Sequence, residues 1–174
     1  MDTTATRKIL LAIDGSPHAL AAVRHALLWH AEAAPAREPG FVLVNVQEPA
    51  SLYEVMVAHD AERIAALKRE AGADLLAPAE ALLDAAGANY ESEVAGGAPE
   101  HLLLELAERY GCSAVVMGAL GMSASPSATD GLGSVALAVL QASPVPVTVV
   151  RAADAEANAD AGEASEAEGA GPET

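Results

Sequence analysis

The sequence predicts an α/β fold: a single domain built on a five-stranded parallel sheet with helices on both faces. Short, almost purely aliphatic runs alternate along the chain with longer segments whose apolar residues have helical spacing, and this alternation is typical of parallel sheets. The chain has 174 residues, of which 52% are hydrophobic and only 3% aromatic. That length suits one domain with an aliphatic, alanine-rich core.

The first predicted strand and helix lie near the N-terminus. Residues 9–13 (ILLAI) are apolar throughout, as expected for a strand buried on both faces. Ser16 and Pro17 predict the start of a helix, because Ser caps helices and Pro fits the first helical position. Its apolar side is expected to carry Leu20, Val23 and Leu27.

The middle of the chain predicts two more strands around a long helical segment. Residues 41–46 (FVLVNV) form a second aliphatic run, and residues 90–94 alternate in the manner of an edge strand. Between them, helical spacing extends from about residue 58 to residue 86. Gly72 and Pro78 predict a kink or a break in that helix.

The last part of the chain predicts two helices and two strands. Pro99 opens a helix that is expected to end near Tyr110, and residues 113–117 (SAVVM) form a buried strand. A glycine-rich loop then leads to a short helix over 134–141 and a final strand over 145–150. In such folds ligands bind at the carboxyl ends of the strands, where the strand order reverses.

The charge is strongly acidic and partly local. The net charge is −16, and residues 152–174 carry seven of the 25 acidic residues and none of the nine basic ones. We therefore expect a folded domain over residues 1–151 and an acidic, disordered tail over 152–174. The negative charge argues against nucleic acid and anionic membranes as partners.

Several functional classes find no support in the sequence. The single cysteine, Cys112, rules out an intrachain disulfide and is expected to be a small buried residue. No histidine, cysteine or acid pattern suggests a metal site, and no catalytic triad or acid pair is recognisable. Apolar runs are too short for a signal sequence or a membrane span, so we expect a cytoplasmic protein without membrane insertion.

The loop between Met117 and Ser134 has features of an anion site. Its glycines allow close approach of a ligand, and the helix that begins at Ser134 directs backbone amides toward the loop. The loop contains no Lys or Arg, so a triphosphate in this acidic protein would need Mg²⁺ to screen its charge. The glycines also fit an ordinary turn, and Asp14, after the first strand, fits helix capping as well as ligand binding.

Three blocks of the chain resemble the universal stress protein family. KILLAIDGSPHALAAVRHAL resembles its first strand and helix, and FVLVNVQEP resembles its second strand. SAVVMGALG followed by GSVALAVLQASPVPVTVV is similar to its closing segment. The resemblance implies a Rossmann-like sheet in the order 3-2-1-4-5, ATP or a related adenine nucleotide as ligand, and a stress-response regulatory role through an unknown protein partner.

The resemblance also implies the site residues, position by position. Adenine would lie against Asp14 and Val46, with Ala12 as a further contact, and the ribose would lie near Met117 and Gly118. The phosphates would be held by Gly121 and by the backbone of Gly133, Ser134 and Val135.

The spacing of the loop departs from the family pattern. Gly-Ser follows Gly121 after eleven residues rather than nine, whereas Gly131 falls at the expected nine but is followed by Leu132. Either the loop has a two-residue insertion or Gly131 takes the glycine role. The alternative function is therefore a family member that binds no nucleotide and acts as a dimeric interaction module.

The resemblance further implies a homodimer paired through the edge strand Val145–Val150. Pro144 and Pro146 leave the opposite interpretation open, because prolines can also block pairing at a sheet edge. No residue is recognisable as a catalytic base, so slow ATP hydrolysis or autophosphorylation is the most enzymatic activity that we expect.

Overall fold

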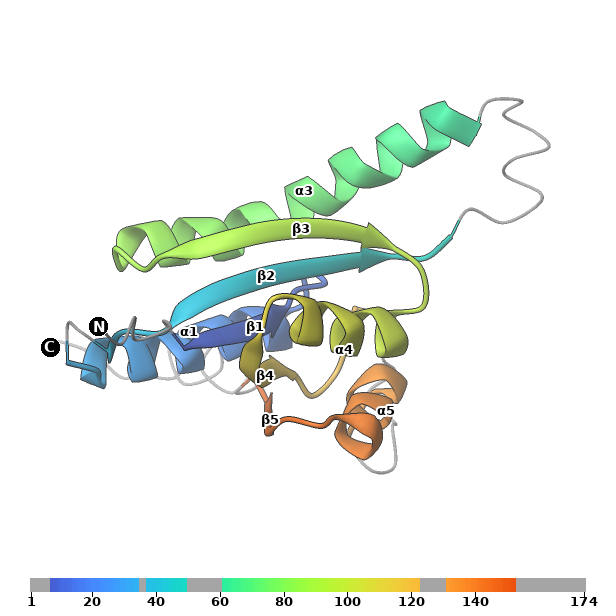
Figure 1. Ribbon diagram of the computed structural model, residues 1–174. Helices are drawn as coiled ribbons and strands as arrows, with labels where there is room; N and C mark the ends of the chain where they lie inside the picture. Colours follow the sequence, from blue (N-terminus) through green and yellow to red (C-terminus); the bar gives the residue numbers. More distant parts are fainter. Residues whose placement is uncertain (1–6, 35–36, 50–60, 123–130, 153–174) are drawn as a thin grey trace, which may run out of the picture.

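The computed structural model of the chain describes residues 7–34, 37–49, 61–122 and 131–152. Its strands form one parallel sheet in the order β3-β2-β1-β4-β5, as predicted (Figure 1). The elements are β1 (Lys8–Ala12), α1 (Pro17–Glu32), β2 (Gly40–Gln47), α3 (Ala61–Ala85), β3 (Tyr90–Gly96), α4 (Pro99–Arg109), β4 (Cys112–Gly118), α5 (Ser134–Ala142) and β5 (Val147–Val150).

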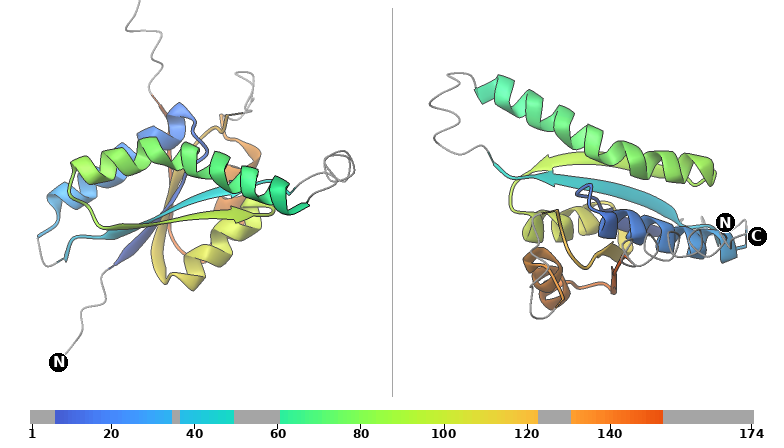
Figure 2. Two further views of the ribbon diagram at one scale, coloured as in Figure 1. Left: turned by 90° about the horizontal axis from the view of Figure 1, so that it is seen from above. Right: turned by 180° about the vertical axis from the view of Figure 1, so that it is seen from behind.

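Two apolar clusters fill the two faces of the sheet. One lies between the sheet and helices α1 and α3, and the other between the sheet and helices α4 and α5 (Figure 2). Successive residues of one strand belong to different clusters, as Ile9 and Leu10 of β1 do. This alternation explains why the central strands are apolar at successive positions. No helix among the described residues is long and apolar enough to cross a membrane.

Helix α1 begins as predicted but packs through smaller residues than expected. The Ser16 hydroxyl accepts a hydrogen bond from the Ala19 amide at 3.1 Å, which caps the helix, and Pro17 occupies the first turn. The fully buried face consists of Ala19, Ala22, Val23 and Ala26. Leu20 and Leu27 are only partly buried, because alanines let the helix axis lie close to the sheet.

Helix α3 is one helix rather than two. It continues through Pro78, although the ring removes one backbone hydrogen bond. Its C-terminal half runs along the sheet, whereas its N-terminal half rises away from it (Figure 1). Gly72 lies where the helix meets β2 and β3, and an added Cβ would come within 2.8 Å of the Asn45 Oδ1 atom. The burial of the Leu76, Ala79 and Leu83 side chains stabilises the helix across the proline.

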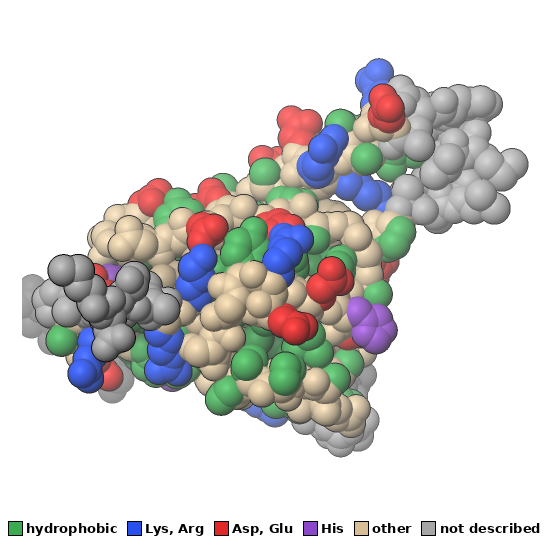
Figure 3. Space-filling view, in the orientation of Figure 1, with side chains coloured by type: hydrophobic (Ala, Val, Ile, Leu, Met, Phe, Trp, Pro, Cys, Tyr) green, Lys and Arg blue, Asp and Glu red, His purple; other side chains and the backbone are tan. Residues whose placement is uncertain are grey.

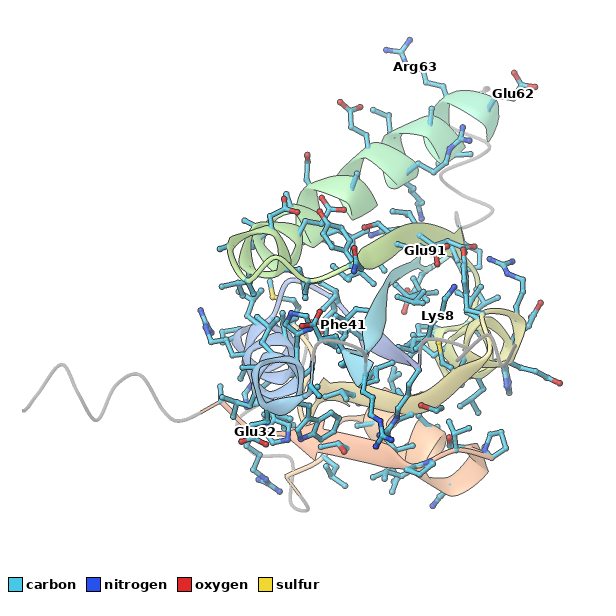
Figure 4. All side chains as sticks on the ribbon, turned by 60° about the vertical axis from the view of Figure 1, so that its left-hand side comes forward. Lys8, Glu32, Phe41, Glu62, Arg63 and Glu91 are labelled. Atoms are coloured by element: carbon cyan, nitrogen blue, oxygen red, sulfur yellow. The ribbon has the colours of Figure 1, made fainter. Side chains whose placement is uncertain are left out.

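Charged side chains cover the face of the sheet beside α4. Lys8 of β1 donates to Glu91 of β3 at 2.6 Å, and Figure 4 shows the two side chains together. Arg109 and Tyr110 both donate to Glu93, and the Arg109 guanidinium lowers the pKa of that carboxyl. Basic and acidic side chains accordingly lie next to one another near the middle of Figure 3. A charged edge strand of this kind resists further strand pairing at β3.

Cys112 is a buried residue, as expected from the sequence. Its side chain belongs to the cluster beneath α4, and only 6% of the residue is exposed. Burial raises the pKa of the thiol to about 11.

This shift predicts an unreactive thiol. At pH 8 the native protein should react with a disulfide reagent about 100-fold more slowly than the unfolded chain, because a pKa raised by about two units lowers the thiolate fraction by that factor. The measurement is absorbance after mixing with DTNB, with the denatured protein as the reference. Equal rates for the two forms would show that the thiol is accessible and ionised in the native state.

Candidate functional site

A cavity of about 520 Å³ opens at the carboxyl edge of the sheet. Its floor comes from the ends of β1, β2 and β4, and its walls come from the first turns of α4 and α5 and from the loop after β4. The strand order reverses between β1 and β4. The cavity therefore lies where a doubly wound sheet leaves room for a ligand.

Nine of the ten predicted binding residues lie in the lining of this cavity. They are Ala12, Asp14, Val46, Met117, Gly118, Gly121, Gly133, Ser134 and Val135. The tenth, Gly131, lies outside the lining and packs against the side chain of Arg151. The structure thus brings together residues from three strand ends and one helix start. Their contact with a ligand stays a prediction.

Asp14 joins the two loops that border the cavity. Its Oδ1 atom accepts a hydrogen bond from the Ser16 amide at 2.9 Å, and its Oδ2 atom accepts one from the Met122 amide at 3.1 Å. The Ser16 hydroxyl also donates to the Leu120 carbonyl at 3.3 Å. The two interpretations of Asp14 are therefore compatible, because the carboxylate orders the local backbone and also lines the cavity.

Asn45 is a positioning residue that the sequence did not single out. It lies inside the aliphatic run of β2, is 2% exposed, and donates from Nδ2 to the Ile13 carbonyl at 2.8 Å. Gln47 in turn donates to the Asn45 Oδ1 atom at 2.7 Å. The hydrogen bond from Asn45 satisfies the buried carbonyl of Ile13, the residue just before Asp14. The signal in the sequence was a single amide within five apolar residues.

Gly118 brings helix α1 close to the end of β4. A Cβ at this position would lie 2.7 Å from the His18 carbonyl carbon and 2.8 Å from the Ala19 nitrogen, which are backbone atoms that cannot rotate away. The glycine is thus required for the contact between strand and helix. It fixes the first turn of α1 next to the cavity.

The N-terminus of α5 opens on the cavity without a capping side chain. Gly133 is the N-cap of α5, and because glycine has no side chain, no side-chain cap accepts a hydrogen bond from the first-turn amides. In α1, by contrast, the Ser16 side chain accepts one from the Ala19 amide. The Gly133 amide itself donates to the Ala119 carbonyl at 2.7 Å, which ties the loop to β4. Residues 133–136 all lie in the lining. Such a helix end favours an anion.

The lining also contains apolar residues that the sequence reasoning missed. Pro99 and Leu103 of α4 belong to this lining, as does Leu132, two residues before α5. Nothing in the sequence distinguishes Leu103 from the other leucines that face the core. The charged residues of the described lining are Asp14 and Glu48, both acids, and the described residues contain no cluster suited to a metal ion.

This sheet order, with a cavity at the point of reversal, defines the class of doubly wound α/β proteins. The model of the universal stress protein family matches residues 5–151. The chain therefore belongs to the universal stress protein family.

Solved structures agree with this fold. Hypothetical protein MJ0577 has a TM-score of 0.72 and 23% identity, over 86% of this chain and 98% of that one. A universal stress protein in complex with cAMP has a TM-score of 0.58 and 24% identity, over 86% and 100%. A universal stress protein from Archaeoglobus fulgidus in complex with dAMP has a TM-score of 0.54 and 19% identity, over 83% and 97%. No curated protein matches the chain.

The close contact at Gly118 generates a stability prediction. Gly118→Ala should lower the free energy of unfolding by about 1–3 kcal/mol, the usual cost of overpacking against atoms that cannot move aside. Chemical denaturation measures the difference. Gly96→Ala is the matched control, because the nearest atom to an added Cβ there is 4.0 Å away. Equal stability of the two variants would contradict the proposed constraint.

Proposed function

We propose that this chain is a cytoplasmic stress-response regulatory protein that binds ATP or a related adenine nucleotide in the cavity at the carboxyl edge of its sheet. Binding changes the surface that a protein partner contacts. The observation that carries the proposal is the convergence on one cavity of nine of the residues that the family resemblance implied.

The chemistry of the floor suits adenine. Ala12, Val44 and Val46 of the floor and Leu103 of the α4 wall offer aliphatic surface to a flat ring. Asp14 lies at the same strand edge, and its carboxylate oxygens can accept a hydrogen bond from an exocyclic amine. The volume of about 520 Å³ is in the range of nucleotide-sized ligands. Among the residues that the structure describes, no aromatic side chain lines the cavity, so burial of the ring against aliphatic side chains would supply most of the affinity.

The opposite end of the cavity suits phosphate. Gly121 and Gly133 present backbone at close range, and the uncapped amides at Ser134 and Val135 are donors for phosphate oxygens. Because Asp14 and Glu48 are both negative, a triphosphate would bring Mg²⁺ with it. Two relatives with known structure carry adenine nucleotides, cAMP in one and dAMP in the other.

Calorimetric titration tests the nucleotide proposal. The protein is titrated with Mg-ATP, and a second sample is purified natively so that mass spectrometry identifies any released ligand. Val46→Phe should weaken binding about tenfold or more, a loss of about 1.4 kcal/mol or more, because the larger ring occupies the adenine position. Leu28→Phe on the exposed surface of α1 is the control. No heat and no thermal shift at millimolar nucleotide would contradict the proposal.

A second function is supported by the charge of the lining. The described lining residues include two acids and no Lys or Arg, which disfavours a triphosphate. In this case the protein would bind no nucleotide and act as a dimeric interaction module. Nucleotide that accompanies the purified protein would exclude this second function.

The edge strand β5 supports a homodimer under either function. The Pro146 carbonyl accepts a hydrogen bond from the Val115 amide of β4 at 2.9 Å, and the Val150 carbonyl accepts one from the Ala119 amide just after β4 at 2.8 Å. Alternate residues of a strand direct their backbone to opposite sides, so Val147 and Val149 face the open edge. Leu137 and Leu140 on the adjoining helix α5 are 46% and 41% exposed. A second copy would cover this apolar surface and pair the edge.

Removal of one outward amide tests the dimer. Val147→Pro should shift the protein toward monomer in sedimentation or light scattering, because proline cannot donate across the open edge. Circular dichroism checks that the variant keeps its fold. A monomeric wild-type protein would instead support the interpretation that the prolines of this segment block pairing, and an unchanged dimer in the variant would place the interface elsewhere.

A further inference from the structure

Arg151 follows the last strand and lies beside the loop that borders the cavity. β4 and β5 are paired so that Gly118 lies opposite Val150, and the Ala119 amide donates to the Val150 carbonyl at 2.8 Å. The next residue after Val150 is therefore held next to the first residues of the loop after β4. Ala119 and Leu120 of that loop line the cavity.

The guanidinium of Arg151 rests on Gly131. Its two terminal nitrogens lie 2.4 and 2.5 Å from the position that a Cβ of residue 131 would occupy. Gly131 has a φ of 63°, a conformation that other residues adopt at a cost. Glycine at this position thus provides both the backbone conformation and the space for the guanidinium.

This contact places a cation near the end of a site whose described charged residues are both acids. Asp14 and Glu48 are the charged residues of the described lining. Arg151 contacts Gly131, which directly precedes the lining residues Leu132 and Gly133 in the sequence. The ion pairs found within the described ranges involve Lys8 and Arg109, not Arg151. The side chain is exposed, so its five donors are available to an anion.

We propose that Arg151 is a specificity-determining residue that contacts the terminal phosphates of a nucleoside di- or triphosphate and makes the site prefer these ligands to monophosphates. This inference rests on the proposed function. Adenine and ribose occupy the enclosed part of the cavity, and the phosphate chain leaves it past Gly133 toward the guanidinium. Bidentate, charge-assisted bonds then replace the Lys or Arg that the loop itself lacks.

The inference also gives a role to the altered spacing of the loop. Gly131, at the spacing expected from the family pattern, lies outside the cavity lining and contacts the Arg151 side chain. Gly133 and Ser134 form the start of α5, which has no side-chain cap, and both lie in the lining. The two glycines therefore do different work. One positions a side chain and the other exposes backbone amides.

Affinities for a ligand series test the inference. Wild type, Arg151→Gln and Arg151→Lys are titrated with AMP, ADP, ATP and inorganic tripolyphosphate. Arg151→Gln should lower the affinities for ATP and tripolyphosphate about tenfold, as expected for the loss of a charge-assisted pair. It should change the affinity for AMP by less than about twofold. Arg151→Lys should recover part of the loss. Arg24→Gln makes the same charge change on the exposed surface of α1 and should have no effect.

The contact between Arg151 and Gly131 is tested separately. Gly131→Ala should reproduce the loss of ATP affinity, because the new Cβ displaces the guanidinium. Gly87→Ala is the matched control: its φ of 66° imposes the same backbone strain, but no atom lies within 4 Å of the added Cβ. If both substitutions change the affinity for ATP, or if neither does, Gly131 does not position Arg151 for phosphate binding.

The outcomes separate this inference from the proposed function. If ATP and AMP both bind, and Arg151→Gln lowers the two affinities equally or leaves both unchanged, the inference is wrong and the nucleotide function stands. If tripolyphosphate binds in an Arg151-dependent way but no nucleotide binds, the residue recognises polyphosphate and the nucleotide function is wrong. If wild type binds none of the four ligands, both are wrong.

Discussion

The parallel pairing of β1 with β4 is the interaction on which the rest of the structure depends. It joins strands far apart in the sequence, with Leu11 opposite Val116 and Ala12 opposite Met117. Because it places β1 between β2 and β4, the strand order reverses at this point and two carboxyl ends lie together. The Asp14 loop and the loop after β4 can bond to each other only because of this pairing.

Helices α1 and α5, two of the helices that start near this edge, differ in how their first turns are capped. At α1, Ser16 caps the first turn and Gly118 lets the backbone pack against β4, so this helix end is satisfied within the protein. At α5, Gly133 provides no side chain and the first-turn amides open on the cavity. A capped start holds the framework, and an uncapped start leaves donors for a ligand.

Much of the candidate site could be predicted, because Asp14 and Gly118 follow recognisable strands and the family resemblance implied the other positions. Asp14 follows an aliphatic run, Val46 ends another, and Gly118 and Gly121 follow a third. Strand ends are recognisable locally, and a parallel sheet collects them at one edge. Leu103 and Asn45 could not be found this way, since their roles depend on which helix covers the strand end and on which carbonyl is left unpaired.

By itself, the sequence determined the alternation of strands and helices, the cap at Ser16, the edge character of β3 and the positions of the strand ends, since these follow from residue periodicity and from local backbone preferences. Only the tertiary structure decided that alanines rather than leucines form the buried face of α1, that α3 continues through Pro78, and that Arg151 rests on Gly131. Each of these depends on packing between distant segments, and no local pattern in the chain encodes the distance between them.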